Sequence, residues 1–167
     1  MANQPDQLAL ETLAAEVGAR LLARGELLAV AESCTGGWVG QCMTAIAGSS
    51  QWFDGGFITY SNTAKQSMLG VPAMTIARHG AVSEPTVRAM AQGVLERTPA
   101  HWSLAISGVA GPSGGNAKNP VGTVCFAWAQ KDGGCVAETC HFDGDREAVR
   151  AQSVRHALNG LLAQMRG

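Results

Sequence analysis

Apolar residues recur along this chain at two alternating spacings. Over residues 5–24, leucines and valines lie three or four positions apart, which is the period of a helix with one buried face. Residues 27–31 form a short continuous apolar run, which is typical of a buried strand. Helices are predicted again up to about residue 46 and over 62–69, 83–97 and 145–165, and strands over 53–60, 102–109, 121–130 and 135–142.

Several residues mark the borders of these segments. Ser83 and Asp145 are placed to cap the helices that follow them, because their side-chain oxygens can accept the first free backbone N–H groups. Gly70 ends the short helix before it, since glycine readily adopts the left-handed conformation of a helix C-cap. Pro72 is expected to prevent immediate resumption of that helix, and residues 78–82 are expected to form a loop.

The order of the elements predicts the fold class. It runs helix, strand, helix, strand, two helices, three strands and a final helix, with residues 131–134 forming a hairpin turn between the last two strands. This order favours an α/β fold, a layered α/β/α sandwich on a mixed β-sheet, over a purely parallel doubly wound sheet. With 167 residues and no shift in composition, we expect a single domain over residues 1–167.

Composition and charge narrow the possible partners. Hydrophobic residues make up 46% of the chain, charged residues 15%, and the formal net charge is −1, so a nucleic-acid partner is disfavoured. The chain does not open on a basic segment followed by an apolar one, and no apolar run approaches the ~18 residues of a membrane-spanning helix. We expect a cytoplasmic protein without nucleic-acid or membrane partners, and the apolar excess favours a homodimer.

Five cysteines are present, an odd number without CxxC spacing, so free thiols are expected rather than a disulfide framework. Cys135, Cys140 and His141 could be considered as metal ligands, but no second ligand pair has a suitable spacing. Cys34 has two possible interpretations. A thiol at a helix N-terminus can be an activated nucleophile, but an unpaired cysteine is usually buried and inert. No metal site is therefore predicted.

Glycine-rich segments follow two of the predicted strands. The chain has 21 glycines, and clusters lie at 36–37 and 108–115, directly after the strands over 27–31 and 102–109. Two such clusters at strand ends suggest one shared ligand pocket. Neither fits the phosphate-binding fingerprints of ATPases or dinucleotide enzymes, and the common signatures of serine hydrolases and zinc proteases are absent.

Ser33 is the candidate nucleophile, since it lies where the strand over 27–31 passes into a helix. A serine needs a base, and Lys65 follows the end of a neighbouring strand together with Tyr60. A lysine that is partly desolvated in a small pocket has a lowered pKa and can take the serine proton near neutral pH. The residues also have structural interpretations: Ser33 as a helix cap, Lys65 on a solvated helix face, and Tyr60 as a half-buried strand residue.

Arg146, near the start of the last helix, could reach a phosphate or could be an exposed arginine without a ligand. The residues alone do not decide between these interpretations.

Five segments together resemble one family. They read Ala-Glu-Ser-Cys-Thr-Gly-Gly over 31–37, Ile-Ala-Gly-Ser-Ser over 46–50, Gly-Phe-Ile-Thr-Tyr-Ser-Asn-Thr-Ala-Lys over 56–65, His-Gly-Ala-Val-Ser over 79–83 and Ile-Ser-Gly-Val-Ala-Gly-Pro over 106–112. In this order and from the first helix to the last, the chain is similar to the CinA C-terminal domain family, whose stand-alone members are nicotinamide-nucleotide amidohydrolases.

The resemblance implies a reaction and its residues. The reaction is hydrolysis of the carboxamide of nicotinamide mononucleotide to nicotinic acid mononucleotide and ammonia, within pyridine-nucleotide recycling, by a serine and lysine pair without metal or cofactor. Ser33 would be the nucleophile and Lys65 its base, with Tyr60 and Ser50 assisting. The residues expected to hold the substrate are Thr35, Gly36, Gly37, Ser107, Gly108, Gly111 and Arg146.

Three alternatives stay open at this point. Ser50 also lies in a small, hydroxyl-rich loop and could attack the amide in place of Ser33. Cys34 could be the nucleophile of the same reaction. The chain could also be a catalytically silent nucleotide-binding module or a competence-associated interaction module.

Overall fold

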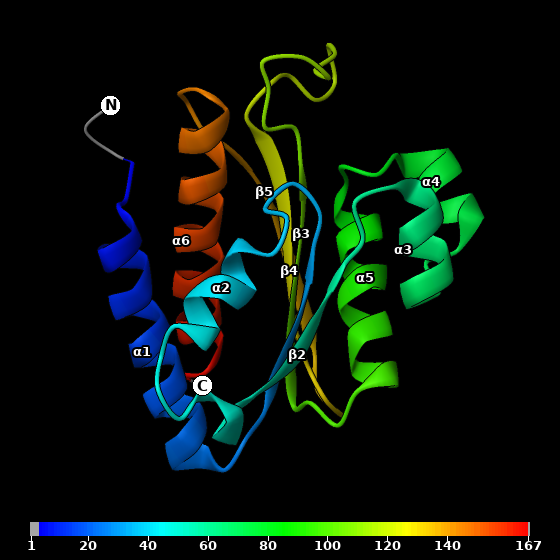
Figure 1. Ribbon diagram of the computed structural model, residues 1–167. Helices are drawn as coiled ribbons and strands as arrows, with labels where there is room; N and C mark the ends of the chain where they lie inside the picture. The colour runs from blue at the N-terminus through cyan, green and yellow to red at the C-terminus, as the bar shows by residue number, and fades with distance from the viewer. Residues whose placement is uncertain (1–3, 167) are drawn as a thin grey trace.

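A β-sheet of five strands lies at the centre of the computed structural model, which describes residues 4–166 (Figure 1). The strands are β1 (Leu28–Glu32), β2 (Phe53–Ile58), β3 (Trp102–Gly108), β4 (Thr123–Gln130) and β5 (Cys135–His141). They lie in the order β2-β1-β3-β4-β5. β2, β1 and β3 are parallel, and β4 and β5 are each antiparallel to the preceding strand, so the sheet is mixed as predicted.

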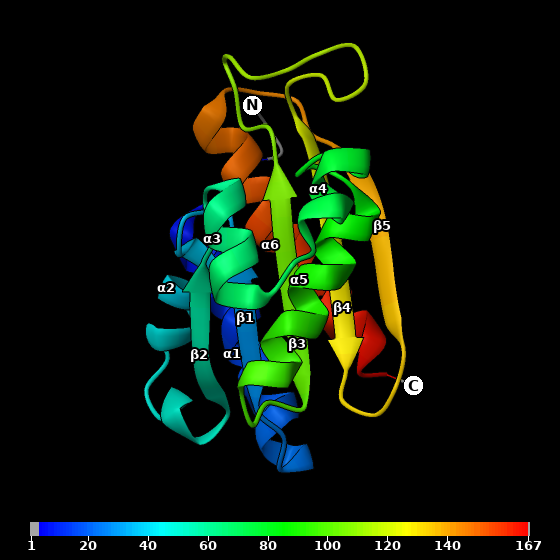
Figure 2. The same ribbon diagram turned by 90° about the vertical axis from the view of Figure 1, so that its right-hand side faces the viewer.

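Helices cover both faces of the sheet (Figures 1 and 2). One face is covered by α1 (Gln7–Arg24), α2 (Trp38–Thr44) and α6 (Arg146–Gln164). The other face is covered by α3 (Asn62–Leu69), α4 (Ala73–His79) and α5 (Glu84–Arg97). The predicted α/β/α sandwich is therefore confirmed.

The two faces of the sheet carry side chains of different size. Large apolar residues such as Leu104, Ile106 and Phe126 point toward α1 and α6. The α5 side of the sheet is lined mostly by alanines. They are Ala29, Ala31, Ala105, Ala127 and Ala129. Since alanine fills little volume, α5 can pack close to the strands.

The predicted caps at Ser83 and Asp145 are confirmed. The side chain of Ser83 accepts a hydrogen bond from Thr86 N, and that of Asp145 accepts one from Ala148 N. Gly70 is the C-cap of α3 as predicted, but Pro72 is the N-cap of an additional helix, α4, which begins at the next residue and extends to His79, into the segment expected to be a loop. Proline is tolerated at this position, since the first turn of a helix needs no hydrogen bond from its N–H group.

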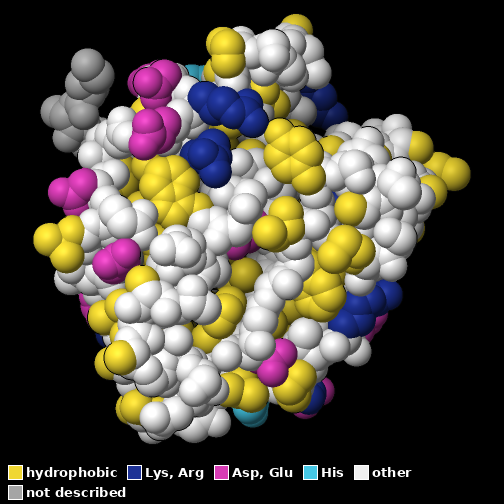
Figure 3. All heavy atoms as spheres, viewed as in Figure 1, with side chains coloured by type: hydrophobic (Ala, Val, Ile, Leu, Met, Phe, Trp, Pro, Cys, Tyr) yellow, Lys and Arg dark blue, Asp and Glu magenta, His cyan; other side chains and the backbone are white. Residues whose placement is uncertain are grey.

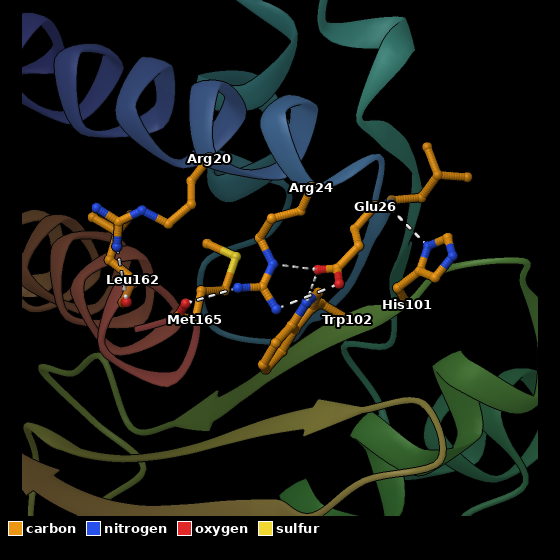
Figure 4. A network of polar contacts seen from close by, with 8 residues as sticks. Arg20, Arg24, Glu26, His101, Trp102, Leu162 and Met165 are labelled. Carbon is orange, nitrogen blue, oxygen red and sulfur yellow. Dashed lines mark hydrogen bonds and ion pairs between the residues drawn. The ribbon is translucent and has the colours of Figure 1, made fainter. Parts of the chain in front are cut away.

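A polar network at the end of the sheet away from the glycine-rich turns fastens α1 to α6 (Figure 4). Arg24 donates to Met165 O at 3.0 Å and to the Glu26 carboxylate at 2.9 Å, and Glu26 also accepts from the indole of Trp102. Burial raises the pKa of Glu26, but hydrogen bonds from Arg24 and Trp102 outweigh burial and lower the pKa below its ordinary value. The network thus favours the ionised carboxylate.

All five cysteines are free thiols, as predicted, with Cys135 and Cys140 half-buried and the other three buried. None of the described helices is both long enough and apolar enough to cross a bilayer.

Candidate active site

A pocket of about 370 Å³ opens where the parallel strands β1 and β3 end. Segments far apart in the sequence contribute to it: the turn after β1, the start of α3, the residues before α5, the loop after β3 and the first residue of α6. The lining residues are Ser33, Cys34, Tyr60, Lys65, Ala81, Val82, Ser107–Gly111, Ser113, Gly114 and Arg146. The carboxyl ends of parallel strands are where α/β folds commonly place ligands.

Ser33 and Lys65 lie in direct contact at the bottom of this pocket. The Lys65 amine is 3.1 Å from Ser33 Oγ. Lys65 is 1% exposed and Ser33 is 7% exposed. Lys65 also donates to the carbonyl oxygens of Thr59 at 2.8 Å and Tyr60 at 3.1 Å. Three oxygens therefore surround the lysine nitrogen and hold it against the serine.

Local structure explains how Lys65 reaches the serine. Thr59 N donates to Glu32 O at 2.9 Å, which continues the pairing of β2 with β1 by one residue. Ser61 then caps α3, and Lys65 lies in the first turns of that helix. Helical side chains point back toward the N-terminus of their helix, so the amine returns to the strand ends.

Burial lowers the pKa of Lys65. The desolvated site disfavours the ammonium and lowers the Lys65 pKa from its ordinary value of 10.5. A nearby thiolate at Cys34 would oppose this, but burial raises the pKa of the Cys34 thiol to about 11. Cys34 is therefore a neutral thiol at neutral pH, which disfavours Cys34 as the nucleophile and leaves the lowered pKa of Lys65 in place.

Glu32 fixes the turn that carries Ser33, and its role is not apparent from the sequence motifs considered. Its carboxylate is 2% exposed and accepts from Thr35 Oγ1 at 2.7 Å, Val39 N at 2.9 Å and Gly40 N at 3.1 Å. Val39 and Gly40 belong to the first turn of α2. A residue at the end of β1 therefore caps α2. The sequence feature that could have predicted this cap is an acidic residue at the end of an apolar run.

Within the described residues, Thr35, Gly36 and Gly37 do not line this pocket, and their contacts with substrate stay a prediction. The Thr35 hydroxyl is buried against Glu32. The glycines instead form the turn, with φ of +59° for Gly36 and +105° for Gly37. Glycine adopts these angles without the steric cost of a Cβ atom.

Arg150 in α6 also holds the turn that carries Ser33, a contact that the sequence did not predict. Its Nε donates to Cys34 O at 3.0 Å and its Nη2 to Thr35 O at 3.2 Å. The guanidinium lies over the Trp38 ring, 5.3 Å from the ring centroid. Since more than 100 positions separate the turn from α6, no local pattern could have revealed this contact.

Tyr60 and Arg146 meet at the mouth of the pocket. The Tyr60 ring is 61% exposed, and its hydroxyl accepts from Arg146 Nη2 at 3.2 Å. Arg146 Nη1 donates to Gly111 O at 2.8 Å. Figure 3 shows Lys and Arg side chains gathered at the N-terminal end of α6, between hydrophobic side chains. The mouth thus offers an aromatic face and a cation, a combination suited to a nucleotide.

Ser107 and Gly108 form the pocket wall at the end of β3. Ser107 is buried. A Cβ atom on Gly108 would lie 2.8 Å from the Val124 side chain and 2.9 Å from Thr123 O, so only glycine fits there. Ser107, Gly108, Gly111 and Arg146 are therefore brought together as expected from the sequence.

Ser50, in contrast, does not lie near Ser33. It belongs to a short 3₁₀ helix, Ser49–Gln51, directly before β2, whereas Ser33 directly follows β1. Because β1 and β2 are parallel, the two serines lie at opposite ends of the sheet, about 15 Å or more apart. The expectation that Ser50 assists in the same pocket is not met within this chain.

Comparisons with known proteins agree on one family. Residues 10–165 match the CinA C-terminal domain family. The nicotinamide-nucleotide amidohydrolase PncC of Escherichia coli K12 is 52% identical over 155 residues, which cover 93% of this chain and 94% of that protein. PncC of Pseudomonas putida is 47% identical over 154 residues, covering 92% and 95%.

A crystal structure of a protein described as competence damage-inducible protein A, from Klebsiella pneumoniae, is also similar. It aligns with a TM-score of 0.91 at 42% identity, over 94% of this chain and 97% of that one.

Proposed function

The chain belongs to the CinA C-terminal domain family, and from this premise we propose that it is a nicotinamide-nucleotide amidohydrolase. The proposed reaction converts nicotinamide mononucleotide and water to nicotinic acid mononucleotide and ammonia. The relatives named for this activity cover nearly the whole chain. The observation that carries the mechanism is the 3.1 Å contact between the buried Lys65 amine and Ser33 Oγ.

The first step is attack of Ser33 on the carboxamide carbon. In the structure the Lys65 amine donates to Ser33 Oγ, Thr59 O and Tyr60 O. The neutral amine has two N–H groups and one lone pair, so it can keep two of these bonds and turn its lone pair to Ser33. The N–H groups donate to Thr59 O and Tyr60 O, and the lone pair accepts the Ser33 proton as the C–O bond forms. The tetrahedral intermediate then carries its negative charge on the former carbonyl oxygen.

The next steps release ammonia and restore the serine. The Lys65 ammonium gives its proton to the amide nitrogen, the C–N bond breaks, and an ester of Ser33 remains. Water then attacks the ester, Lys65 takes a proton from that water, and the proton returns to Ser33 as the C–O bond of the ester breaks. The products are the carboxylic acid and ammonia, so atoms and charge balance.

Other lining residues have supporting roles in this proposal. Cys34, directly after Ser33, and residues 110–111 line the pocket, and their backbone N–H groups are the proposed donors to the oxyanion. The exposed Tyr60 ring can stack on the pyridine. Arg146 carries a full charge at the mouth and can pair with the substrate phosphate.

Ammonia release from nicotinamide mononucleotide by the purified protein tests the proposal, with the nucleotide product identified by chromatography. Stoichiometric ammonia and nicotinic acid mononucleotide are expected. A protein that is stabilised thermally by the nucleotide but releases no ammonia would instead support the silent binding module.

A further inference from the structure

Three chemically different side chains converge at a place unrelated to the pocket lining. Glu138 and Cys140 lie two positions apart on β5, so both face α6, and His156 of α6 lies opposite them. A carboxylate oxygen of Glu138, Cys140 Sγ and a ring nitrogen of His156 lie within 4.8 Å of one another. The side chains of His156 and Glu138 are 32% and 46% exposed, and Cys140 is half-buried.

Two partners compete for one nitrogen atom in this cluster. Glu138 Oε1 is in close contact with His156 Nε2, and Cys140 Sγ lies 3.4 Å from the same atom. An imidazole nitrogen carries either one proton or one lone pair, so it can form a full hydrogen bond with only one of them. A cation bound by all three atoms removes this competition.

The donor set, and the spacing of its sulfur and nitrogen atoms, suit a specific class of ion. Glu138 Oε1 lies closer to His156 Nε2 than two ligands of one ion would, so the partly exposed Glu138 side chain has to move outward when the ion binds. Thiolate, imidazole and carboxylate are the protein ligands of zinc, with Zn–S of about 2.3 Å and Zn–N of about 2.0–2.1 Å. At a tetrahedral angle these bond lengths place sulfur and nitrogen about 3.5 Å apart. The separation of 3.4 Å between Cys140 Sγ and His156 Nε2 is close to that value.

The charge and packing of the cluster also favour a bound cation. Within residues 4–166, His156 is the sole basic group paired with Glu138, so no lysine or arginine neutralises the carboxylate. The His156 ring is held against aromatic rings, with centroids 4.6 Å from Phe126 and 5.9 Å from Phe142.

We propose that Glu138, Cys140 and His156 form a binding site for a thiophilic divalent cation of the zinc class, with water as the fourth ligand. The ion would join edge strand β5 to α6. Cys140 pairs with Val124, which pairs with Gly108, so the site lies two strands, or about 10 Å, from the pocket wall. It would stabilise the scaffold and take no part in amide hydrolysis, so the proposal does not rest on the proposed function.

Cobalt(II) is the probe, because its spectrum reports both geometry and thiolate ligation. Untagged protein, freed of metal with a chelator and kept reduced, is titrated with Co²⁺. We expect saturation at one equivalent, visible bands of tetrahedral cobalt and a near-ultraviolet thiolate-to-cobalt band. Zn²⁺ should displace the cobalt and raise Tm.

Matched cysteine variants make the test specific. Cys140→Ser should abolish the thiolate band and the rise in Tm, whereas Cys135→Ser, on the opposite face of β5, should retain both. Glu138→Gln should keep the fold and weaken cobalt binding by more than the roughly 10–100-fold that loss of an outer-sphere partner costs. Binding only at millimolar Co²⁺, or an identical titration of wild type and Cys140→Ser, would overturn the proposal.

Discussion

Replacement of Lys65 by methionine removes the proposed base with little change in side-chain volume. Proton transfer by a positioned base contributes typically 10²–10⁴-fold to a rate, which corresponds to about 2.7–5.5 kcal/mol of activation free energy. We therefore expect kcat/KM for ammonia release from nicotinamide mononucleotide to fall by at least about 100-fold. Lys131→Met, an exposed lysine in the turn between β4 and β5, is the matched control and should retain full activity.

The Lys65 variant must also be shown to fold. Methionine leaves the carbonyl oxygens of Thr59 and Tyr60 without the lysine donor, at a net cost of about 1 kcal/mol for each bond, whereas burial of an ammonium is no longer required. Tm should thus change by less than about 8 °C. Activity above one tenth of wild type in a folded Lys65→Met protein would refute the assignment of Lys65 as the base.

The pH dependence of kcat/KM and of stability also tests the role of Lys65. Burial lowers the Lys65 pKa, so the free amine is present at a pH below 10.5, and kcat/KM should rise with pH and level off before that value. Between the folded-state pKa of Lys65 and 10.5, Lys65 is protonated in the unfolded chain but neutral in the folded protein. The free energy of unfolding should therefore fall as pH decreases from 10.5 to the folded-state pKa of Lys65. Lys65→Met should lack both effects.

Three further predictions concern groups around the pocket and the scaffold. Arg146→Lys should raise KM for nicotinamide mononucleotide about 10-fold with little change in kcat, because one charged hydrogen bond contributes about 1.5 kcal/mol; an unchanged KM contradicts a phosphate contact. Glu32→Gln should lower the free energy of unfolding in urea by about 2 kcal/mol and reduce kcat, since the amide oxygen can replace only one carboxylate oxygen and the NH₂ cannot accept from the α2 N–H group that it faces; stability equal to wild type contradicts this role. The free energy of unfolding should decrease as pH falls through the lowered pKa of Glu26, below 4.5, and this pH dependence should be weaker in Glu26→Gln. An equal pH dependence in the variant would contradict a contribution of Glu26 to stability.

Much of the fold was predictable because its signals are local. Helical spacing, strand runs and caps such as Ser83 and Asp145 each depend on a few neighbouring residues. The helix α4 was missed because Pro72 has two opposite meanings, a breaker inside a helix and a favourable residue at its start. The packing of Ile76, the residue of α4 that is buried in the core beside α5, distinguishes them.

The site was predictable in part. Ser33 and Lys65 could be paired because each follows the end of a strand and parallel strands end together. The same rule places Ser50 at the opposite end of the sheet once β1 and β2 are known to be parallel, since Ser50 precedes its strand. From α6, Arg150 contacts the turn after β1 and His156 contacts β5, and contacts of that kind depend on the packed fold rather than on spacing.

Ser33, held by Lys65, is the proposed nucleophile. Initial rates of ammonia release from nicotinamide mononucleotide by Ser33→Ala and Ser50→Ala, each verified as folded, test this assignment. Ser33→Ala should lose at least about 1000-fold in kcat, whereas Ser50→Ala should stay within about threefold of wild type. Substantial activity in Ser33→Ala, or an equally inactive Ser50→Ala, would contradict the account.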